Sequence, residues 1–497
     1  MSIWLLIPIL IPVIAGAALP YAVPRTDRNA LHRYVALVVA LNAVVVVLLV
    51  AGYGDTSLRA LELTSAINLF LRLDDLARFF MVLASGLWLI VTFYSFGYIQ
   101  PEGGKDRTFY AFYMITYGVI MGACMAGNFF TLYLFYELIT LATYPLVVHS
   151  RTPEAKRAGA KYLMYSFFGA ALALVAFFFI ADYGLTTDFV AGGVLVPALV
   201  AGNETMLLVV FLLAFVGFGC KAYIWPLFEW VPASYPLAPA PAAALLSGVV
   251  SKVAVLAIIR TTFYLFGADF VYGTWAQTAL LCMALLTVFM GSMLAFKEKV
   301  FAKRLAFSSV GQLSYVLFGI ILLNPLALLG ALLHVVFHGI IKVALFLCAG
   351  AVTFKTDRKY VYEMRAVGKA MPITMWCFTL AAVSLVGVPP TGGFVSKWSL
   401  AMGAIGSNHP TLGLVGVGVL LVSALLTAGY LVTIFADAFF PGAGYSYKKL
   451  VNAEPGKIMT VPLIVLAALG ILLGMFPGAL IGFIQGITVV AMGGGGL

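Results

Sequence analysis

The chain has 497 residues, of which 63% are hydrophobic and only 10% are charged, and its formal net charge is +10 at pH 7. A soluble globular protein has about 25% charged residues, so this composition excludes a soluble globule and predicts a protein embedded in a lipid bilayer. Almost no sequence separates the apolar segments, so we expect one all-α membrane domain over residues 1–497.

About fourteen apolar segments are long enough to cross a membrane, since a spanning helix needs about 20 residues. In chain order they cover approximately residues 2–23, 32–53, 76–99, 108–126, 128–149, 158–182, 206–235, 241–267, 273–296, 303–323, 327–354, 372–407, 411–440 and 458–484. The first segment lacks a preceding basic stretch and a small-residue cleavage site. We therefore interpret it as a span and not as a removable signal peptide.

Basic residues are concentrated in every second loop between these segments. The basic loops lie near residues 25–33, 105–107, 151–161, 297–304, 355–369 and 448–457, whereas the opposite loops contain only Arg59, Arg72 and Arg78. Loops rich in lysine and arginine stay on the cytoplasmic side. The pattern predicts a protein of the prokaryotic inner membrane with both termini outside the cytoplasm, and it explains the positive charge without nucleic acid as a partner.

Two segments contain residues that interrupt a helix. Segment 206–235 has two glycines before Lys221 and prolines after it, and segment 372–407 has three glycines and two prolines just before Lys397. Proline removes a backbone donor and clashes with the preceding turn, and in lipid the freed carbonyls need protein or water partners. We therefore expect both breaks, each with its lysine, inside the bundle beside a wet cavity.

The two breaks lie five segments apart, and an odd number of helices in a unit reverses the direction of the next unit. We expect residues 108–267 and 273–440 to form two inverted five-helix repeats with sites at the broken helices, as in many transporters. Residues 1–107 supply three helices before them, and residues 441–497 supply the last helix. Two unrelated kinks are the alternative, which the lysine at each break disfavours.

Ionisable residues inside the apolar segments are the strongest functional signal. They are Glu137, Lys221, Lys252, Lys342 and Lys397, with Lys303 at one membrane edge. A charge at mid-membrane costs about 2.5–3.5 kcal/mol on insertion scales, so we expect these side chains to be used, by default to move a charged species. The alternatives are amines that reach the membrane surface and, for Glu137, a structural ion pair between helices.

His334, His338 and Lys342 are spaced four residues apart in segment 327–354, which places them on one helical face. A row of titratable groups across an apolar helix is typical of a proton relay. Two histidines at this spacing can also bind zinc, but no carboxylate or cysteine nearby completes a site, so we predict no metal. A histidine that only packs and bonds a carbonyl is the remaining alternative.

The sequence contains no motif for a cofactor or for hydrolysis. Its five cysteines are scattered over apolar segments without a CxxC spacing: Cys124, Cys220, Cys282, Cys348 and Cys377. We expect inert buried thiols and no iron–sulfur or disulfide role. We also predict no cofactor and no redox chemistry, so the energy for transport has to come from an ion gradient or from partner subunits.

Several short motifs lie between residues 70 and 480. They are Leu73-Asp74-Asp75, Tyr94 to Tyr98, Tyr136-Glu137-Leu138, Lys221 to Phe228, Ala238 to Pro241, Leu246-Ser247-Gly248, Lys303 to Ser309, the row from His334 to Lys342, and Gly387 to Trp398. Together they resemble the antiporter-like membrane subunits of respiratory complex I, Mrp-type Na+/H+ antiporters and group 4 membrane-bound hydrogenases. The resemblance implies two inverted five-helix units and a proton path that lies partly along the membrane plane.

The resemblance also implies roles for single residues. Glu137 and Lys221 take the place of the family's Glu–Lys pair. Lys252, His338 and Lys342 match its central relay, and Lys397 matches the ionisable residue of the second broken helix. Lysine at position 397 and the chain length resemble the D subunits of Mrp antiporters or the related subunits of hydrogenase-type complexes.

The resulting hypothesis is a proton-translocating subunit that works with other membrane subunits in the lipid bilayer and moves H+, with Na+ as a candidate second ion. Three alternatives stay open. The chain can be a pump subunit of a complex I-like oxidoreductase or group 4 hydrogenase, a structural anchor whose charges serve only helix packing, or a free-standing solute transporter.

Overall fold

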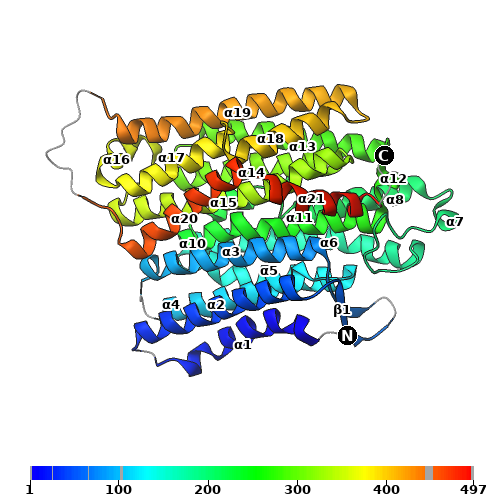
Figure 1. Cartoon of the computed structure of the whole chain (residues 1–497), viewed down its shortest axis with the longest axis horizontal. Helices are drawn as coiled ribbons and strands as arrows, with labels where there is room; N and C mark the ends of the chain where they lie inside the picture. Colours follow the sequence, from blue (N-terminus) through cyan, green and yellow to red (C-terminus); the bar gives the residue numbers. More distant parts are fainter. Residues whose placement is uncertain (1–2, 25, 65–66, 101–103, 443–451, 494–497) are drawn as a thin grey trace.

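The computed structural model describes residues 3–24, 26–64, 67–100, 104–442 and 452–493. Its helices run roughly parallel to one another along the long axis of a single bundle, with α1 at one edge and α19 at the other (Figure 1). In the described part of the chain, 11 helices are long and apolar enough to cross a membrane. The mostly helical membrane fold expected from the composition is therefore confirmed.

The long helices overlap the predicted apolar segments, with ends that differ by several residues. The last segment corrects a prediction, because it contains two helices, Lys457–Met475 and Gly478–Ala491, where one was expected. The helices of the first half are α1 (Ile7–Ala22), α2 (Arg28–Gly52), α3 (Asp75–Tyr98), α4 (Lys105–Cys124), α5 (Phe129–Val147), α6 (Pro153–Tyr183), α8 (Glu204–Gly219), α9 (Trp230–Ser234), α10 (Ala240–Leu245) and α11 (Ser251–Ile259). Those of the second half are α13 (Trp275–Lys297), α14 (Phe301–Ile321), α15 (Pro325–Thr356), α17 (Pro372–Val386), α18 (Gly392–Ile405), α19 (Pro410–Phe439), α20 (Lys457–Met475) and α21 (Gly478–Ala491). Short helices α7 (Pro197–Val200), α12 (Ala268–Val271) and α16 (Val367–Ala370) lie in the connections.

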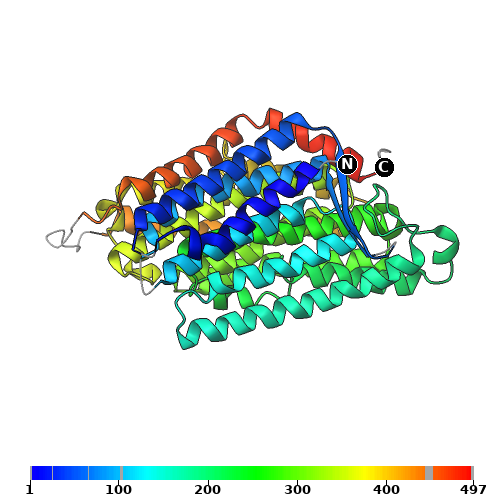
Figure 2. The same cartoon turned by 90° about the horizontal axis from the view of Figure 1, so that it is seen from below.

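A β-hairpin between α2 and α3 is a feature that the all-α expectation omitted. Strands β1 (Thr56–Glu62) and β2 (Asn68–Leu73) pair antiparallel, with Thr56 opposite Leu73 and a bulge between Arg59 and Leu61. Both strands are short and contain charged residues, so their sequence resembles that of a loop between two strongly apolar segments. The hairpin lies at the same end of the bundle as the first and last described residues, which we name the hairpin end (Figure 2).

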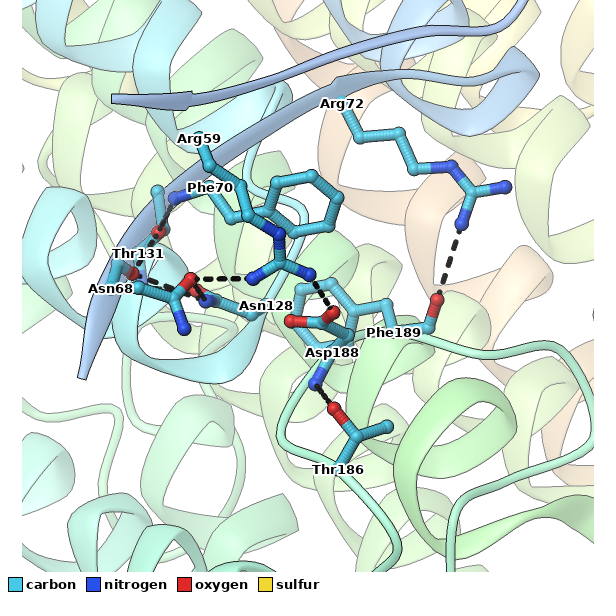
Figure 3. Close-up of polar contacts among 9 residues, drawn as sticks. All are labelled: Arg59, Asn68, Phe70, Arg72, Asn128, Thr131, Thr186, Asp188 and Phe189. Atoms are coloured by element: carbon cyan, nitrogen blue, oxygen red, sulfur yellow. Dashed lines mark hydrogen bonds and ion pairs between the residues drawn. The ribbon is translucent and has the colours of Figure 1, made fainter. Parts of the chain in front are cut away.

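Polar contacts hold the hairpin on the bundle (Figure 3). Arg59 forms an ion pair with Asp188, and the Asn128 side-chain amide donates to the Asn68 side-chain oxygen at 2.7 Å. The Arg72 guanidinium donates to the Phe189 carbonyl at 3.3 Å. These bonds join the hairpin to the start of α5 and to the loop that follows α6. The opposite end of the bundle carries the lysine- and arginine-rich loops, and we name it the basic end.

Both predicted helix breaks are present. After α8 ends at Gly219, residues 220–229 form turns before α9 begins. In the second break α17 ends at Val386, Gly387 follows at a positive φ of 94°, and α18 begins at Gly392. A left-handed residue at a helix end is favourable for glycine because glycine has no Cβ.

The centre of the bundle is formed by two helical segments. The apolar segment Ala240–Phe266 and helix α15 are both fully buried over their most apolar 18 residues, whereas only 33% of the corresponding stretch is buried in α2 and in α19. The outer helices therefore present apolar side chains to the surroundings. One of them corrects a prediction: Cys282 on α13 is exposed and not buried, while the other four cysteines are buried free thiols.

Segment Ala240–Phe266 is not a uniform α-helix. Two π-helical stretches, Leu246–Val250 and Arg260–Phe266, flank α11. A π-turn bonds residue i to i+5 in place of i+4, and it occurs frequently at functional sites. Lys252 lies two residues after the end of the first of these stretches.

Candidate functional site

Helix α15 carries the predicted row of titratable side chains. His334 is 1% exposed, and His338 and Lys342 are 0% exposed. The imidazole rings of the two histidines stack with their centroids 5.7 Å apart. The spacing of four residues therefore places the three side chains on one face of α15, and that face is turned into the bundle and away from lipid.

Lys252 approaches this row from α11. Its Nζ lies 2.8 Å from Nδ1 of His338, donates to the Ser247 carbonyl and lies 3.3 Å from the Ser251 hydroxyl. Ser247 is in the π-helical stretch, where the changed backbone pairing brings a carbonyl five residues back within reach of the amine. The π-turn thus helps to hold the Lys252 amine against α15.

Lys342 is held by α14. Its Nζ donates to the Leu305 carbonyl at 3.1 Å and to the Ser308 hydroxyl at 2.7 Å. The Ser309 hydroxyl bonds the same Leu305 carbonyl at 3.0 Å and lies 2.9 Å from the Ser247 hydroxyl. A path of hydrogen-bonding groups therefore runs from the surroundings of Lys342 to those of Lys252.

Lys397 is joined to the break in the second broken helix. Its Nζ donates to the carbonyls of Leu385 and Val386 at 2.6 and 3.1 Å. These are the last carbonyls of α17, which the helix leaves without intrahelical donors. A lysine at the break is thus explained by local chemistry: its ammonium group satisfies backbone oxygens that the interruption exposes.

The residue before Lys397 connects it to α15. The Ser396 hydroxyl lies 2.9 Å from Nδ1 of His334. The His334 ring stacks on Tyr315 with centroids 5.4 Å apart, and the Lys397 amine lies 5.2 Å from the centre of the same Tyr315 ring. Lys252, His338, His334, Lys342 and Lys397 are thus connected by direct contacts or through one to three intervening groups, and we name these five residues the central cluster.

Glu137 and Lys221 lie apart from the central cluster and are not in direct contact with each other. The Lys221 Nζ donates to the Tyr136 carbonyl at 2.8 Å and lies 3.5 Å from the centre of the Tyr136 ring. Glu137, the next residue, is half-buried, and its buried Oε1 has no hydrogen-bond partner among the described residues. The two side chains interact electrostatically over a longer distance than an ion pair.

The central cluster contains bases and no acid. Among the described residues no carboxylate contacts any of its five side chains, and both histidines interact electrostatically with Lys252, Lys342 and Lys397. Two like charges about 4 Å apart repel by about 4 kcal/mol at an effective dielectric constant near 20. A proton on one of these side chains therefore disfavours a proton on its neighbour, so the cluster is suited to passing protons along.

Hydroxyl groups between the charged residues are the part of the site that the sequence reasoning missed. Ser247 contacts Lys252 through its backbone carbonyl, while Ser308 and Ser396 contact Lys342 and His334 through their hydroxyls. A partial signal was available, because the first two lie in the motifs Leu246-Ser247-Gly248 and Lys303 to Ser309, and the third directly precedes Lys397. Which hydroxyl meets which amine depends on how separate helices pack.

Comparisons with known proteins agree with this architecture. The family model described as NADH:quinone oxidoreductase/Mrp antiporter, TM, matches residues 126–434. The N subunit of the NADH-quinone oxidoreductase of Desulforudis audaxviator (strain MP104C) is 32% identical over 415 residues, which are 81% of each chain. The D subunit of the Na(+)/H(+) antiporter of Alkalihalophilus pseudofirmus (strain ATCC BAA-2126 / JCM 17055 / OF4) is 31% identical over 473 residues, which are 94% of this chain and 93% of the relative.

A solved structure shares the fold. A chain in the structure of the Mrp complex from Dietzia sp. DQ12-45-1b superposes with a TM-score of 0.85 at 19% identity, covering 99% of this chain and 98% of that chain. The family resemblance expected from the motifs is therefore confirmed, and the protein belongs to the NADH:quinone oxidoreductase/Mrp antiporter membrane family.

Proposed function

We propose that this chain is a proton-translocating antiporter-like subunit of a multi-subunit membrane complex, most like the D subunit of an Mrp-type Na+/H+ antiporter. The central cluster carries the proposal: Lys252 contacts His338 at 2.8 Å, and His334 contacts Ser396, the neighbour of Lys397, at 2.9 Å. A series of titratable groups in the two most buried helical segments of a bilayer protein is costly, and its use as a proton path accounts for its presence.

The proton path that we propose begins at Glu137 and Lys221 and ends at Lys397. From Lys252 a proton passes directly to His338 through their shared hydrogen bond. The Nε2 atoms of His338 and His334 are buried without a partner among the described residues. Both atoms are free to bond a bridging water, which carries a proton between groups too far apart for a direct bond. From His334, whose ring and the Lys397 amine both contact the Tyr315 ring, the proton reaches Lys397 through a further bridging water.

The orientation that we propose follows the charge of the loops. The basic end faces the cytoplasm of a prokaryotic cell under the positive-inside rule, and both termini lie on the other side of the membrane, together with the hairpin. The broken helices at Lys221 and Lys397 support two inverted units within about fourteen crossings.

Other membrane subunits are the partners that we propose. On α5, Glu137 lies among Leu134, Leu138 and Leu141, which are 37%, 36% and 52% exposed. An ionisable residue beside an exposed apolar stripe is poorly placed against lipid alone. A neighbouring subunit that covers this stripe would complete the surroundings of Glu137.

The test is Na+-driven proton movement in inverted vesicles. The vesicles come from antiporter-deficient cells that produce the chain together with its co-encoded subunits, and an acridine dye reports the pH change after addition of NaCl. We expect Lys252→Met to abolish the signal at an unchanged amount of assembled complex. Lys297→Met is the matched control, because Lys297 is exposed in the last turn of α13 at the basic end, outside the central cluster. Wild-type rates in Lys252→Met would refute the proposal, and failure of assembly alone would favour a structural anchor.

A pump subunit of a redox complex is the second candidate, favoured by the 32% identity to a relative named as the N subunit of an NADH-quinone oxidoreductase. The two candidates differ in their neighbours. We expect the tagged chain, purified in mild detergent from its native membrane, to bring down subunits without visible absorbance. Flavin or iron–sulfur absorbance in the purified complex would identify a redox pump instead.

A further inference from the structure

A narrow cavity enters the bundle from the basic end between α10, α14 and α15. It has a volume of about 120 Å³, and its lining includes Tyr98, Tyr235, Ala243 and Lys359. A pocket of about 500 Å³ with a polar rim adjoins it and shares Tyr98 as a lining residue. Since a water molecule needs only about 10–15 Å³ of such space, the cavity can hold several waters in contact with the basic end.

Two buried tyrosines connect the inner wall of this cavity to the central cluster. Tyr235 lines the cavity, and its hydroxyl bonds directly to the hydroxyl of Tyr223, which is fully buried. The Tyr223 hydroxyl also donates to the Leu246 carbonyl at 3.3 Å and interacts with the nearby Ser251 side chain, although no direct hydrogen bond joins these two hydroxyls among the described residues. Ser251 in turn lies 3.3 Å from the Lys252 Nζ. A series of hydroxyl groups, with one gap between Tyr223 and Ser251, thus leads from the cavity to Lys252.

The break in the first broken helix positions this series. Lys221 and Tyr223 are two residues apart in the interruption, and Tyr223 has a positive φ of 69°, which is uncommon for a residue with a side chain. From this backbone the Lys221 amine reaches Tyr136 on α5, while the Tyr223 hydroxyl reaches the π-helical stretch beside Lys252. The same helix interruption therefore positions two side chains that reach different sites, Tyr136 on α5 and the π-helical stretch beside Lys252.

We propose that Tyr235 and Tyr223 carry protons from the cavity to Lys252, so that the central cluster has its own entrance at the basic end, separate from Glu137 and Lys221. The inference rests on the proposed function. A hydronium ion in the cavity gives a proton to the Tyr235 oxygen, and the Tyr235 proton passes to Tyr223. The Tyr223 proton passes through a bridging water to Ser251, whose proton binds the neutral Lys252 amine. Each hydroxyl gains one proton and loses one, and reorientation of the hydroxyls restores the starting arrangement.

The decisive variants remove single hydroxyl groups and keep the rings. In the inverted vesicles, whose outer face is then the basic end, we expect Tyr223→Phe and Tyr235→Phe each to slow proton movement at least about tenfold, since positioned proton-transfer groups contribute about 10²–10⁴-fold in rate. Tyr94→Phe is the matched control, because the buried Tyr94 hydroxyl donates to the Leu347 carbonyl at 2.7 Å outside this series. Rates are compared per amount of assembled complex.

These variants separate the two proposals. Loss of transport in Lys252→Met with wild-type rates in both tyrosine variants would overturn this entrance and leave the proposed function standing. Wild-type rates in Lys252→Met would overturn the proposed function itself. If Tyr223→Phe lowers the amount of complex, Tyr235→Phe decides the question, because Tyr235 lies at the cavity and outside the helix break.

A labelling experiment tests the cavity without any transport assay. In a variant whose native cysteines are replaced by alanine, we expect Ala243→Cys to react with a small charged methanethiosulfonate reagent added at the basic end. Ala254→Cys is the control, because Ala254 is 0% exposed and lies outside the cavity lining. Reaction of Ala243→Cys alone supports a hydrated entrance, and absence of reaction would show that the cavity is dry and overturn the proposal.

Discussion

The Lys252 amine and the His338 imidazole face each other across a hydrogen bond of 2.8 Å, although both groups are bases. Such a bond forms only when one partner offers a proton and the other a lone pair. Moving that single proton from one nitrogen to the other exchanges the two roles without moving either helix. The contact therefore holds one proton in two alternative places, at the midpoint of the proposed path.

Removal of the imidazole tests this contact. We expect His338→Ala to slow Na+-driven proton movement at least about tenfold, as for other groups that transfer protons, because Lys252 loses its only described partner on α15. The measurement is the acridine-dye signal per amount of assembled complex. His409→Ala is the control, because His409 lies half-buried outside the central cluster and contacts Gln277 at 2.9 Å. Equal rates in the two variants would contradict a role for His338.

The support of Lys342 by Ser308 gives a second prediction. Ser308→Ala removes the hydroxyl that lies 2.7 Å from the Lys342 amine. A buried donor that loses its acceptor costs about 1–3 kcal/mol, so we expect a lower melting temperature of the purified complex together with slower proton movement. Ser314→Ala is the matched control on α14, because within the described part of the chain the Ser314 hydroxyl bonds only the Val310 carbonyl of its own helix. The prediction is wrong if both serine variants behave alike.

The second helix break depends on close backbone approach at Gly393. A Cβ built at this position lies only 1.7 Å from the Ser384 carbonyl oxygen, which leaves no room for a methyl group. We expect Gly393→Ala to destabilise the complex by several degrees in a thermal melt and to reduce its assembly. A Cβ at Gly418 on α19 meets nothing within 4 Å, so Gly418→Ala should leave the melting temperature nearly unchanged. A stable Gly393→Ala complex would show that the break can relax.

Stability at the basic end should depend on pH through Glu298, in the turn between α13 and α14. Burial raises the pKa of Glu298, but the Lys299 and Val300 N–H groups and the Lys303 amine outweigh burial and hold that pKa below its usual value. A lowered pKa stabilises the folded state above the usual carboxyl pKa, and the contribution is lost as pH falls. We expect Glu298→Gln to lower the melting temperature at pH 7 and to have less effect near pH 4.

An exposed acidic residue provides the comparison for Glu298. Asp357 is 88% exposed and lies 3.3 Å from the Lys359 amine. Exposed ion pairs contribute only about 0–1 kcal/mol, so Asp357→Asn should change the melting temperature little at either pH. A Glu298→Gln effect that is equal at pH 7 and pH 4 would argue against the carboxylate as its cause.

Much of this fold and part of the site follow from local patterns in the sequence. Apolar length predicts the helices, and glycine with proline predicts the two breaks. The spacing of four residues predicts the shared face of His334, His338 and Lys342. These three predictions succeed because each depends on the sequence of a single helix. The hairpin was missed because its strands are short and partly charged.

Contacts between helices could not be predicted in the same way. The expected Glu137–Lys221 contact is replaced by a bond from Lys221 to the Tyr136 carbonyl, one residue away. The Tyr136 carbonyl belongs to the backbone of α5, so the group that the Lys221 amine reaches depends on how the helix break packs against α5. The tyrosine and serine hydroxyls beside Lys252 come from several segments, so no periodicity in one segment reveals them.

Because of the π-turn at Leu246–Val250, the number of residues in this stretch matters as well as the identity of its side chains. Deleting one residue there would restore ordinary α-helical winding and rotate everything upstream by about 100° relative to Lys252. No ionisable group would be lost, yet Ser247 and the neighbours of Tyr223 would face elsewhere. A homologous sequence that is one residue shorter at this point would need different hydrogen-bond partners for its lysine, even if every charged position were identical.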